Sequence, residues 1–382
     1  MWINVIGQSR TKHILQSAIH SGKLPGAYLF AGPEGTGKDA AAFELAKALN
    51  CLNPQMDERS SMDGAEACDE CSNCISISAL ASPAVTFVHA LTKDISAEGA
   101  AQKDEDIEAI REQLAAKAAD PYYNLDIPRA TSIQIGQIRE LRLALSRSLS
   151  GGKKRVVIVS EADMMNPQAQ NAFLKTLEEP HSNTLIILTS SNASRLLPTV
   201  LSRCQLVRFD LLSAKEISEA LIKRDELPPA QAEFLARLSG GSYSRAREAI
   251  GEDVQEMRNQ IVSFLRMGLS RSRRNAALEI DKFLPRAAGG KFLDKRQAVE
   301  RRLTLLTLWL RDALALSTKA ESEIVNFDQK EDLMKFVTRL GEPKRIIEAI
   351  SAVDKAMHLT KLQLQLRPVM LQLVMDLEAA LV

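Results

Sequence analysis

The feature that most constrains this chain is a glycine-rich segment near the N-terminus, Gly32-Pro33-Glu34-Gly35-Thr36-Gly37-Lys38-Asp39. It has the G-x-x-x-x-G-K pattern of a phosphate-binding loop, and it lies between an apolar run at 27–30 and a helical pattern at 38–49. In such a loop, backbone N–H groups turn toward phosphate oxygens, the helix N-terminus adds partial positive charge, and the lysine adds a full one. The order of strand, loop and helix therefore predicts an α/β domain built around a nucleotide site; a turn without a ligand is the alternative.

The loop ends on a residue that is wrong for catalysis. After Lys38 the motif requires Ser or Thr, whose hydroxyl holds Mg²⁺, and this chain has Asp39. A carboxylate can bind Mg²⁺, but it also places a negative charge beside the triphosphate. A second metal position is altered as well, because the apolar run 156–159 is followed by Ser160-Glu161, where P-loop ATPases have Asp-Glu. We expect ATP or ADP to bind weakly or not at all, and hydrolysis to be absent or very slow.

Two further positions complete the predicted nucleotide site. Glu161 keeps the second carboxylate of the metal-handling pair, and Thr189 and Ser190 end the apolar run 185–188, where a γ-phosphate would lie. Simple termination of a strand explains these two hydroxyl groups equally well. The predicted site consists of Gly32, Gly35, Thr36, Gly37, Lys38, Asp39, Glu161 and Thr189.

Four of the five cysteines form a second candidate site. Cys68, Cys71 and Cys74 are each separated by two residues, Cys51 lies a short loop upstream, and Cys204 is far away in the sequence. Four thiolates from two nearby turns can surround Zn²⁺ tetrahedrally, as in structural zinc sites. Disulfides are a poorer explanation in a reducing compartment, while free thiols or a redox pair remain alternatives. We expect a structural zinc with no open coordination position.

The distribution of apolar runs predicts the domain organisation. Continuous apolar runs alternate with helical patterns in the first half of the chain, which is typical of buried strands in a parallel, doubly wound α/β sheet. The expected strands lie at 27–30, 85–89, 156–159, 185–188 and 206–209. After the capping box Ser213-Ala214-Lys215-Glu216 no convincing strand pattern follows. The predicted parts are an α/β domain at 1–210 with a zinc module at 51–74 and an insertion at 91–130, a small helical lid domain at 211–255, and a larger helical domain at 256–382.

The insertion and several basic residues have plain structural explanations. Ile107, Ile110 and Leu114 recur at helical spacing among many charges, which predicts a largely solvated helix. Lys153, Lys154 and Arg155 could contact DNA. The favoured explanation is that they are solvent-exposed residues that precede the strand at 156–159. Arg203 carries a guanidinium group suited to phosphate oxygens, although an isolated arginine before a strand is usually a surface charge.

Composition adds few constraints. A length of 382 residues is that of two or three domains, and a net charge of +1 neither requires nor excludes a nucleic-acid partner. With 4% aromatic residues, base stacking is not expected to be the main means of binding. The sequence has no apolar run of bilayer length and no basic, apolar leader, which predicts a cytoplasmic protein without a membrane partner.

Taken together, these motifs resemble the clamp-loader branch of the AAA+ proteins, and within it the delta-prime family of bacterial DNA polymerase III subunits. The resemblance covers essentially the whole chain. It rests on Val5-Ile6-Gly7-Gln8, the loop at 32–38, the four cysteines, the run Asn171-Ala172-Phe173-Leu174-Lys175-Thr176-Leu177-Glu178-Glu179-Pro180, and Ser202-Arg203-Cys204. The altered positions Asp39 and Ser160 distinguish the chain from the catalytic gamma/tau subunits.

The resemblance implies a mechanism and a set of partners. The implied partners are the gamma/tau and delta clamp-loader subunits, with the sliding clamp and primer–template DNA engaged through the complex. Arg203 would reach, in trans, the ATP site of a neighbouring gamma/tau subunit and stabilise the transferring phosphoryl group. The chain would then be a largely non-hydrolysing stator, and residues 256–382 would form an oligomerisation collar. Arg139 and Lys175 lie on helices that face the central chamber in this family, which makes them candidates for phosphate contact.

One motif departs from the family pattern. Catalytic relatives have Gly-Ser-x-Arg in the lid, whereas this chain has Gly241-Ser242-Tyr243-Ser244-Arg245. One extra residue turns the arginine by about 100° around the helix, so we expect Arg245 to point away from the loop. Two other functions remain open: an active ATPase of the gamma/tau type, and a zinc-dependent DNA-binding adaptor outside any clamp loader.

Overall fold

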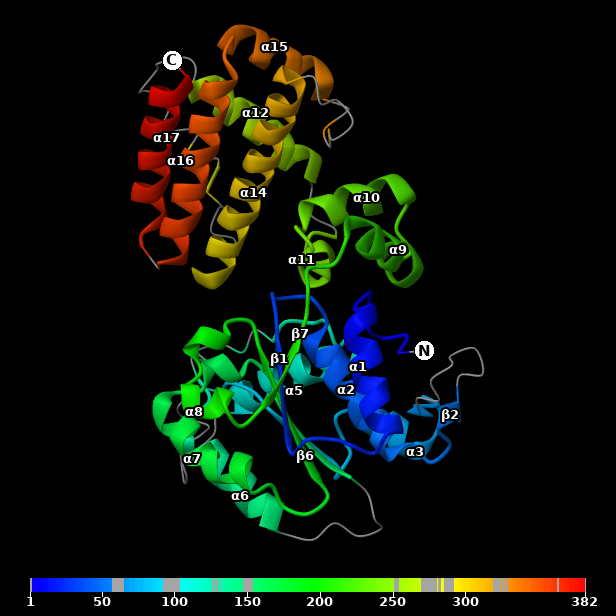
Figure 1. The fold of residues 1–382 in the computed structure, drawn as a ribbon. Coiled ribbons are helices and arrows are strands. Elements are labelled where there is room, and N and C mark those ends of the chain that lie inside the picture. The colour runs from blue at the N-terminus through cyan, green and yellow to red at the C-terminus, as the bar shows by residue number, and fades with distance from the viewer. Residues whose placement is uncertain are drawn as a thin grey trace. The chain divides into compact units, whose positions relative to one another are not determined.

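The chain forms two compact units, Met1–Glu248 and Ala249–Val382 (Figure 1). A computed structural model describes residues 2–56, 65–91, 104–125, 127, 130, 132–146, 154–250, 254–268, 280, 283–284, 292–318, 324, 326, 329–362 and 364–381. The first unit combines a sheet with helices, and every described element of the second unit is a helix. The finer division predicted at residues 210 and 255 stays a prediction.

The first unit is built on a five-stranded sheet with the strand order β4-β5-β6-β1-β7, in which every pairing is parallel. Its strands are β1 (Ala27–Ala31), β4 (Val85–Val88), β5 (Arg155–Val159), β6 (Thr184–Ser190) and β7 (Gln205–Arg208). All five predicted apolar runs are therefore strands, and the central strand β6 is buried along its whole length. Phe30 of β1 lies opposite Thr189 of β6 and Val207 of β7. The carboxyl ends of the strands thus meet at one edge, where the phosphate-binding loop begins.

Helices cover both faces of this sheet (Figure 1). On one side lie α1 (Ser9–His20) and α2 (Lys38–Asn50), and on the other lie α6 (Ile135–Ser146), α7 (Pro167–Glu178) and α8 (Pro198–Leu201). Asn166 caps the start of α7: its side chain accepts a hydrogen bond from the Ala169 N–H at 2.7 Å, and Pro167 is the first helical residue. Phe173 and Leu177 of α7 pack in the core against the sheet, which fixes this helix over β5 and β6.

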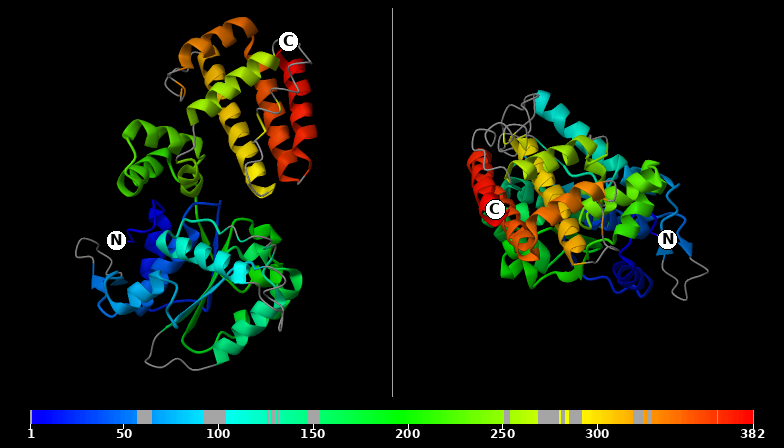
Figure 2. Two further views of the ribbon diagram at one scale, coloured as in Figure 1. Left: turned by 180° about the vertical axis from the view of Figure 1, so that it is seen from behind. Right: turned by 90° about the horizontal axis from the view of Figure 1, so that it is seen from above.

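Shorter elements form the cysteine module and the insertion. The module contains the antiparallel strands β2 (Gln55–Met56) and β3 (Ala65–Glu66) and the helix α3 (Ser72–Ser78). The predicted helix of the insertion is present as α5 (Asp104–Ala119), visible in cyan in the left view of Figure 2. Two single-turn helices, η1 (Ala162–Met164) and η2 (Ala193–Arg195), follow β5 and β6. Parts of the predicted insertion, including 92–103, lie outside the described residues.

Three helices follow β7 within the first unit. They are α9 (Ala214–Asp225), α10 (Pro229–Leu238) and α11 (Tyr243–Glu248). The predicted capping box at α9 is confirmed, because the Ser213 hydroxyl accepts from the Glu216 N–H at 3.2 Å and the Ser213 N–H donates to Glu216 Oε2 at 2.8 Å. We call these three helices the lid.

The second unit packs long helices around an apolar interior. Its described helices are α12 (Val254–Gly268), α14 (Phe292–Ser317), α15 (Lys330–Leu340), α16 (Pro343–Lys361) and α17 (Leu366–Leu381). On α14, Leu303, Leu306 and Leu310 are fully buried, and α16 packs against both α14 and α17. These leucines are core residues of the second unit.

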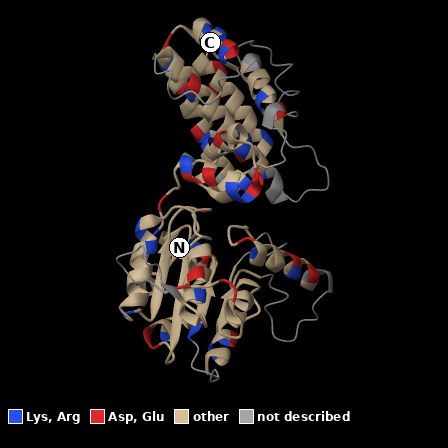
Figure 3. Cartoon of the chain, turned by 90° about the vertical axis from the view of Figure 1, so that its right-hand side faces the viewer, with Lys and Arg blue, Asp and Glu red and all other residues tan. Residues whose placement is uncertain are grey.

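Charged residues are dispersed over the helices, with Lys and Arg near Asp and Glu along the cartoon (Figure 3). Strands β1, β4 and β6 contain no charged residue, which matches their burial in the sheet. Among the described helices, none has the length and apolar character needed to cross a lipid bilayer. The predicted fold class is confirmed: a P-loop α/β domain with a parallel sheet and an inserted four-cysteine module, followed by helices.

Candidate functional site

The phosphate-binding loop joins β1 to α2, as its motif predicts. Lys38, the first residue of α2, is 8% exposed and donates from Nζ to the carbonyl oxygens of Gly32 at 2.8 Å and Pro33 at 2.7 Å. The Thr36 hydroxyl donates to the same Pro33 oxygen at 2.8 Å. Burial lowers the pKa of Lys38, while nearby carboxylates, first that of Asp39, act in the opposite direction. Two of the three ammonium donors are therefore directed at the loop's own carbonyl groups.

Asp39 is the centre of a buried polar cluster. Its Oδ2 lies 2.7 Å from Lys117 Nζ and accepts a hydrogen bond from Ser160 Oγ at 2.8 Å, and its Oδ1 accepts from Thr189 Oγ1 at 2.8 Å. The exposed fractions of the Lys117 and Asp39 side chains are 5% and 14%. Burial acts to raise the pKa of Asp39, but Lys117 and the two hydroxyl groups outweigh it and hold that pKa below its ordinary value. The two altered metal positions, 39 and 160, thus contact each other directly.

The other two predicted nucleotide residues lie beside this cluster. The Thr189 hydroxyl donates to Asp39 and accepts from the Glu161 N–H at 3.2 Å, so it is engaged on both sides within the chain. Glu161 is exposed at the edge of the pocket. Desolvation by the pocket raises the pKa of Glu161 to about 7, and the charges of Asp39 and Glu34 act in the same direction. The structure brings the predicted loop residues, Glu161 and Thr189 together; their role in binding a nucleotide stays a prediction.

The insertion brings two residues to the loop that the sequence analysis did not assign to the site. Lys117 lies in the last turn of α5, and Tyr122 follows that helix. Tyr122 lies so close to Gly37, whose φ is 94°, that a Cβ atom on Gly37 would be 2.5 Å from the tyrosine hydroxyl. The same hydroxyl accepts a hydrogen bond from the Ile6 N–H at 2.8 Å. A signal for Lys117 was present, because it continues the helical face of the apolar stripe formed by Ile107, Ile110 and Leu114.

The lid contacts the loop from the other side. The Tyr243 N–H donates to the Gly35 carbonyl at 3.1 Å, and the Ser244 hydroxyl donates to the Tyr122 carbonyl at 2.6 Å. The prediction that Arg245 points away from the loop is wrong, since its guanidinium lies 3.7 Å from Glu34 Oε2. The reason is that α11 begins directly against Gly35, so every residue of its first turn is near the loop.

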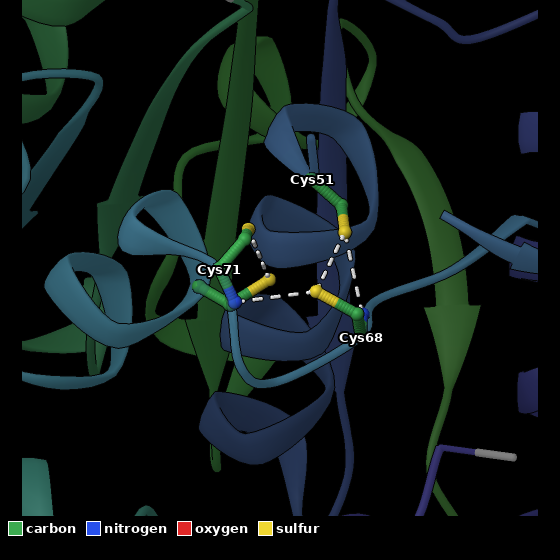
Figure 4. Close-up of side chains that lie close together, drawn as sticks. Cys51, Cys68 and Cys71 are labelled. Atoms are coloured by element: carbon green, nitrogen blue, oxygen red, sulfur yellow. Dashed lines mark hydrogen bonds between the residues drawn. The ribbon is translucent and has the colours of Figure 1, made fainter. Parts of the chain in front are cut away.

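The four clustered cysteines come together as predicted. Cys51 follows α2, Cys68 lies in the loop before α3, and Cys71 is the N-cap residue of α3 (Figure 4). Cys74 lies in the first turn of α3. Their sulfur atoms all lie within 4.8 Å of one another, with Cys51–Cys68 at 3.4 Å and Cys71–Cys74 at 3.5 Å. In tetrahedral zinc sites with Zn–S bonds of about 2.3 Å, neighbouring sulfur atoms are about 3.8 Å apart. The cluster therefore has the geometry and the donor set of a structural zinc site.

Backbone hydrogen bonds in this cluster favour thiolates, the form that binds metal. The Cys68 N–H donates to Cys51 Sγ and the Cys71 N–H donates to Cys68 Sγ, both at 3.3 Å. Burial acts to raise the pKa of Cys71, but hydrogen bonds to its sulfur, first that from the Leu52 backbone, lower it to about 6. Cys204, the fifth cysteine, is not part of the cluster, and burial raises its pKa to about 12.

Arg203 lies two residues before β7, at the end of the sheet opposite the phosphate-binding loop. Its Nε donates to Glu178 Oε1 at 2.8 Å, and its Nη1 donates to the Thr199 carbonyl at 2.8 Å. The Arg203 side chain remains 30% exposed. The guanidinium group is therefore oriented by the chain and still reaches solvent.

The other basic candidates are placed as follows. Arg139 on α6 and Lys175 on α7 are exposed, and their contact with phosphate stays a prediction. Arg155 donates from Nη1 to the Leu145 carbonyl at 2.7 Å, so it satisfies the C-terminal end of α6, which agrees with its structural explanation. Lys153 lies outside the described residues.

Comparison with known proteins decides the family. A family model described as "DNA polymerase III, delta subunit" matches residues 7–213, which include the loop, the four cysteines and Arg203. The chain belongs to this family. Its resemblance to the delta-prime subunits is also confirmed by curated relatives, and the family membership agrees with the P-loop AAA+ class inferred from the motifs.

Three of these relatives are informative. DNA polymerase III subunit delta' of Bacillus subtilis is 27% identical over 321 residues, which are 84% of this chain and 81% of that protein. DNA polymerase III subunit delta' of Pseudomonas aeruginosa is 33% identical over 238 residues, 62% of this chain and 59% of that protein. DNA polymerase III subunit tau of Bacillus subtilis is 29% identical over 221 residues, 58% of this chain and 30% of that protein.

Proposed function

We propose that this chain is the delta-prime subunit of a DNA polymerase III clamp loader and acts there as a largely non-hydrolysing stator. It supplies Arg203 as an arginine finger to the ATP site of a neighbouring gamma/tau subunit, and it supports loading of the sliding clamp on primed DNA during replication. The observation that carries this proposal is the Asp39 cluster: the two positions that should hold Mg²⁺, Asp39 and Ser160, are hydrogen-bonded to each other, and Asp39 also forms an ion pair with Lys117. A subunit with such a site contributes to hydrolysis through residues that it offers to another subunit.

The placement of Arg203 supports a role in trans. In a parallel sheet the residue before a strand and the residue after it lie at opposite edges, and the four residues of β7 span roughly 13 Å at about 3.3 Å per residue. Arg203 is thus remote from the Lys38 loop of its own chain. An exposed guanidinium held by Glu178 is suited to the charge that develops on a transferring phosphoryl group of another site.

The proposal includes a metal and partners. We propose that Cys51, Cys68, Cys71 and Cys74 hold one structural zinc ion, because four sulfur ligands leave no open position for chemistry. The partners are gamma/tau and delta subunits, with the clamp and primer–template DNA reached through the complex, in the cytoplasm. The helical residues 256–382 form the collar.

Reconstitution tests the arginine finger. The chain and its Arg203→Ala variant are assembled with gamma/tau and delta, and DNA-stimulated ATP hydrolysis is measured. Arginine fingers in trans increase the rate by about 10³–10⁵ at the site they serve. We therefore expect hydrolysis at that site to be lost and the total rate to drop by the share of one site. Arg203→Lys should behave like Arg203→Ala, since an ammonium lacks the planar fork.

A matched control is Arg237→Ala in the lid, because Arg237 is also a partly exposed arginine paired with a glutamate, Glu233. It should leave hydrolysis unchanged. Equal rates for the native and Arg203→Ala complexes, with assembly intact, would refute the role of Arg203.

Two measurements on the isolated chain address the other functions. Magnesium-dependent ATP turnover that Lys38→Ala abolishes would favour an active gamma/tau-type ATPase. Tight, strongly salt-dependent DNA binding that Cys71→Ser abolishes would favour a DNA-binding adaptor. We expect neither.

A further inference from the structure

We propose that Lys117 is a built-in cation that takes the place of a divalent metal at Asp39, and that Tyr122 and the lid close the same loop, so that this P-loop rejects magnesium nucleotides. The residues present do not fit the metal–nucleotide complex that the motif implies. This inference goes beyond the proposed function and does not depend on Arg203.

The metal position is filled by the chain itself. Magnesium needs oxygen ligands in near-ideal octahedral geometry at about 2.0–2.1 Å. In P-loop NTPases two of its ligands come from the positions that are Asp39 and Ser160 here. Asp39 Oδ2 already contacts Lys117 at 2.7 Å and Ser160 at 2.8 Å, and Oδ1 contacts Thr189 at 2.8 Å. A metal would have to displace a buried ammonium group that makes an ion pair with this carboxylate.

The phosphate position is closed as well. Tyr122 packs on Gly37, and the lid packs on Gly35, where an added Cβ atom would lie 2.0 Å from the Ser242 hydroxyl oxygen. Gly35 and Gly37 should let a phosphate approach the backbone, but here the space beside them is occupied by Ser242 and Tyr122 of the same chain. The remaining cavity has a volume of about 40 Å³. Side chains of the insertion and the lid thus narrow the space over the loop in which a phosphate would have to lie.

The charges of the pocket oppose a phosphate. Its described lining includes three carboxylates, those of Glu34, Asp39 and Glu161, and two ammonium groups, those of Lys38 and Lys117. Lys117 is neutralised by Asp39, and Lys38 donates to its own loop. Glu34 also lies 3.7 Å from Arg245. An incoming triphosphate would therefore have to draw Lys38 and Lys117 away from their partners within the chain, and it would lie close to carboxylates that repel it.

The segment that closes the loop is anchored independently of any ligand. Lys117 Nζ also donates to the Tyr123 carbonyl at 2.8 Å, which shapes the turn after α5. The Tyr122 carbonyl accepts from Ser244 of the lid, and Asp120 forms an ion pair with Arg247 of α11. Core, insertion and lid hold one another in place through these contacts, so the closed arrangement is the ground state of the chain.

A gain-of-binding experiment tests the inference. The variant Asp39→Thr/Ser160→Asp/Lys117→Met restores both metal-binding residue types and removes the ammonium group; a second variant adds Tyr122→Ala. Binding of a fluorescent ADP derivative with Mg²⁺ is titrated against each isolated full chain, with folding checked by circular dichroism. We expect no saturable binding by the native chain. The second variant should bind at least about 100-fold more tightly than the native chain, and removal of magnesium should weaken that binding.

Two controls locate the effect. Lys38→Ala added to the second variant should abolish the gained binding, and Lys117→Arg in the native chain should leave binding absent because it keeps the cation. Micromolar binding of MgADP by the native chain would overturn the inference. So would a folded second variant that still binds nothing.

If the variants do not fold, hydrogen exchange of the native chain decides. Peptides covering 32–38 should exchange at the same rate with and without MgADP, and protection on addition of MgADP would overturn the inference. The Arg203 experiment measures hydrolysis by the complex, so failure of one proposal is distinguishable from failure of the other.

Discussion

Arg203 and Glu178 form an ion pair that joins the loop before β7 to the last residue of α7. Arg203 Nε lies 2.8 Å from Glu178 Oε1, and the Thr199 carbonyl receives a further hydrogen bond from Nη1 at 2.8 Å. Fixing a long side chain in advance reduces the conformational entropy that is lost when it engages a target. Glu178 is therefore a positioning residue for the proposed arginine finger.

Glu178→Gln should lower ATP hydrolysis by the reconstituted complex, but by less than Arg203→Ala does. The pair is partly exposed, so the free energy of unfolding should change by less than about 1 kcal/mol. Steady-state hydrolysis and thermal unfolding measure the two effects. Glu233→Gln, which removes the partner of Arg237, is the control. If the lower activity of Glu178→Gln is explained by lower stability of the variant, the result would contradict a positioning role.

Lys117→Met should destabilise the first unit by about 3–5 kcal/mol, because it leaves the Asp39 carboxylate buried without its cation. Asp39→Asn combined with Lys117→Met should recover most of this loss, since neither charge is then buried. Urea unfolding of the two single variants and the double variant measures the coupling. Lys335→Met, which removes an exposed partner of Glu331, should cost less than about 1 kcal/mol. Additive effects of the two single changes would contradict the pairing.

Glu161→Gln should make stability less dependent on pH. The pKa of Glu161 is about 7 in the folded chain and 4.5 in the unfolded chain, so its contribution to stability is fully present below pH 4.5 and is lost as pH rises through about 7. A glutamine side chain at this position cannot ionise, so we expect the variant to be more stable than the native chain at about pH 8 and similar to it at about pH 4.5. Urea midpoints across this range measure the difference. A native chain that gains stability relative to the variant between about pH 5 and 8 would show the opposite sign.

Tyr122→Phe should cost about 1–3 kcal/mol, because the buried Ile6 N–H loses its partner. Tyr122→Ala should lower the free energy of unfolding by more, about 3–5 kcal/mol. It also removes the ring that packs edge-on against Tyr243, with the two ring centroids 4.9 Å apart. Urea unfolding measures both. Tyr123→Phe makes the same chemical change one residue away and serves as the control. Equal effects at positions 122 and 123 would argue against a special role for Tyr122.

Cys71→Ser should abolish stoichiometric zinc and lower the thermal midpoint. A metal that binds only the folded chain stabilises it by about 2.7 kcal/mol when its free concentration is 100 times its dissociation constant. Metal content after purification without chelator, and unfolding with and without chelator, measure this. Cys204→Ser removes a thiol outside the cluster and should change neither the zinc content nor the effect of chelator on unfolding. Almost no zinc in the purified native chain would contradict the proposed metal site.

Local features of the sequence predicted the fold well. Asn166-Pro167 and the capping box at Ser213 set helix starts through contacts within a few residues, so these starts could be predicted without knowledge of the tertiary structure. The buried strands followed from continuous apolar runs for a similar reason, because a strand covered on both faces needs no polar side. The cysteine cluster followed from spacing, since Cys68, Cys71 and Cys74 belong to one short turn and helix.

The contents of the candidate site could be predicted only in part. The loop and the two altered positions were visible in the sequence. Lys117 and Tyr122 come from the insertion, where helical spacing predicted a helix but did not show that this helix reaches the loop. Pairing of Asp39 with Lys117 depends on tertiary structure, and local periodicity does not report it. Arg245 was mispredicted because its direction was taken from helix geometry alone, while the position of the start of α11 beside Gly35 decides it.

The hydrogen bond from Ser244 to the Tyr122 carbonyl matters for any attempt to shorten the protein. A truncation at residue 210 would remove α9, α10 and α11 and leave Tyr122, Gly35 and Glu34 without the groups that cover them. Such a fragment would expose a tyrosine and a glycine turn to water, and it would tend to self-associate. A fragment that ends at Glu248 keeps these contacts and coincides with the first compact unit, so it is the better piece to express alone.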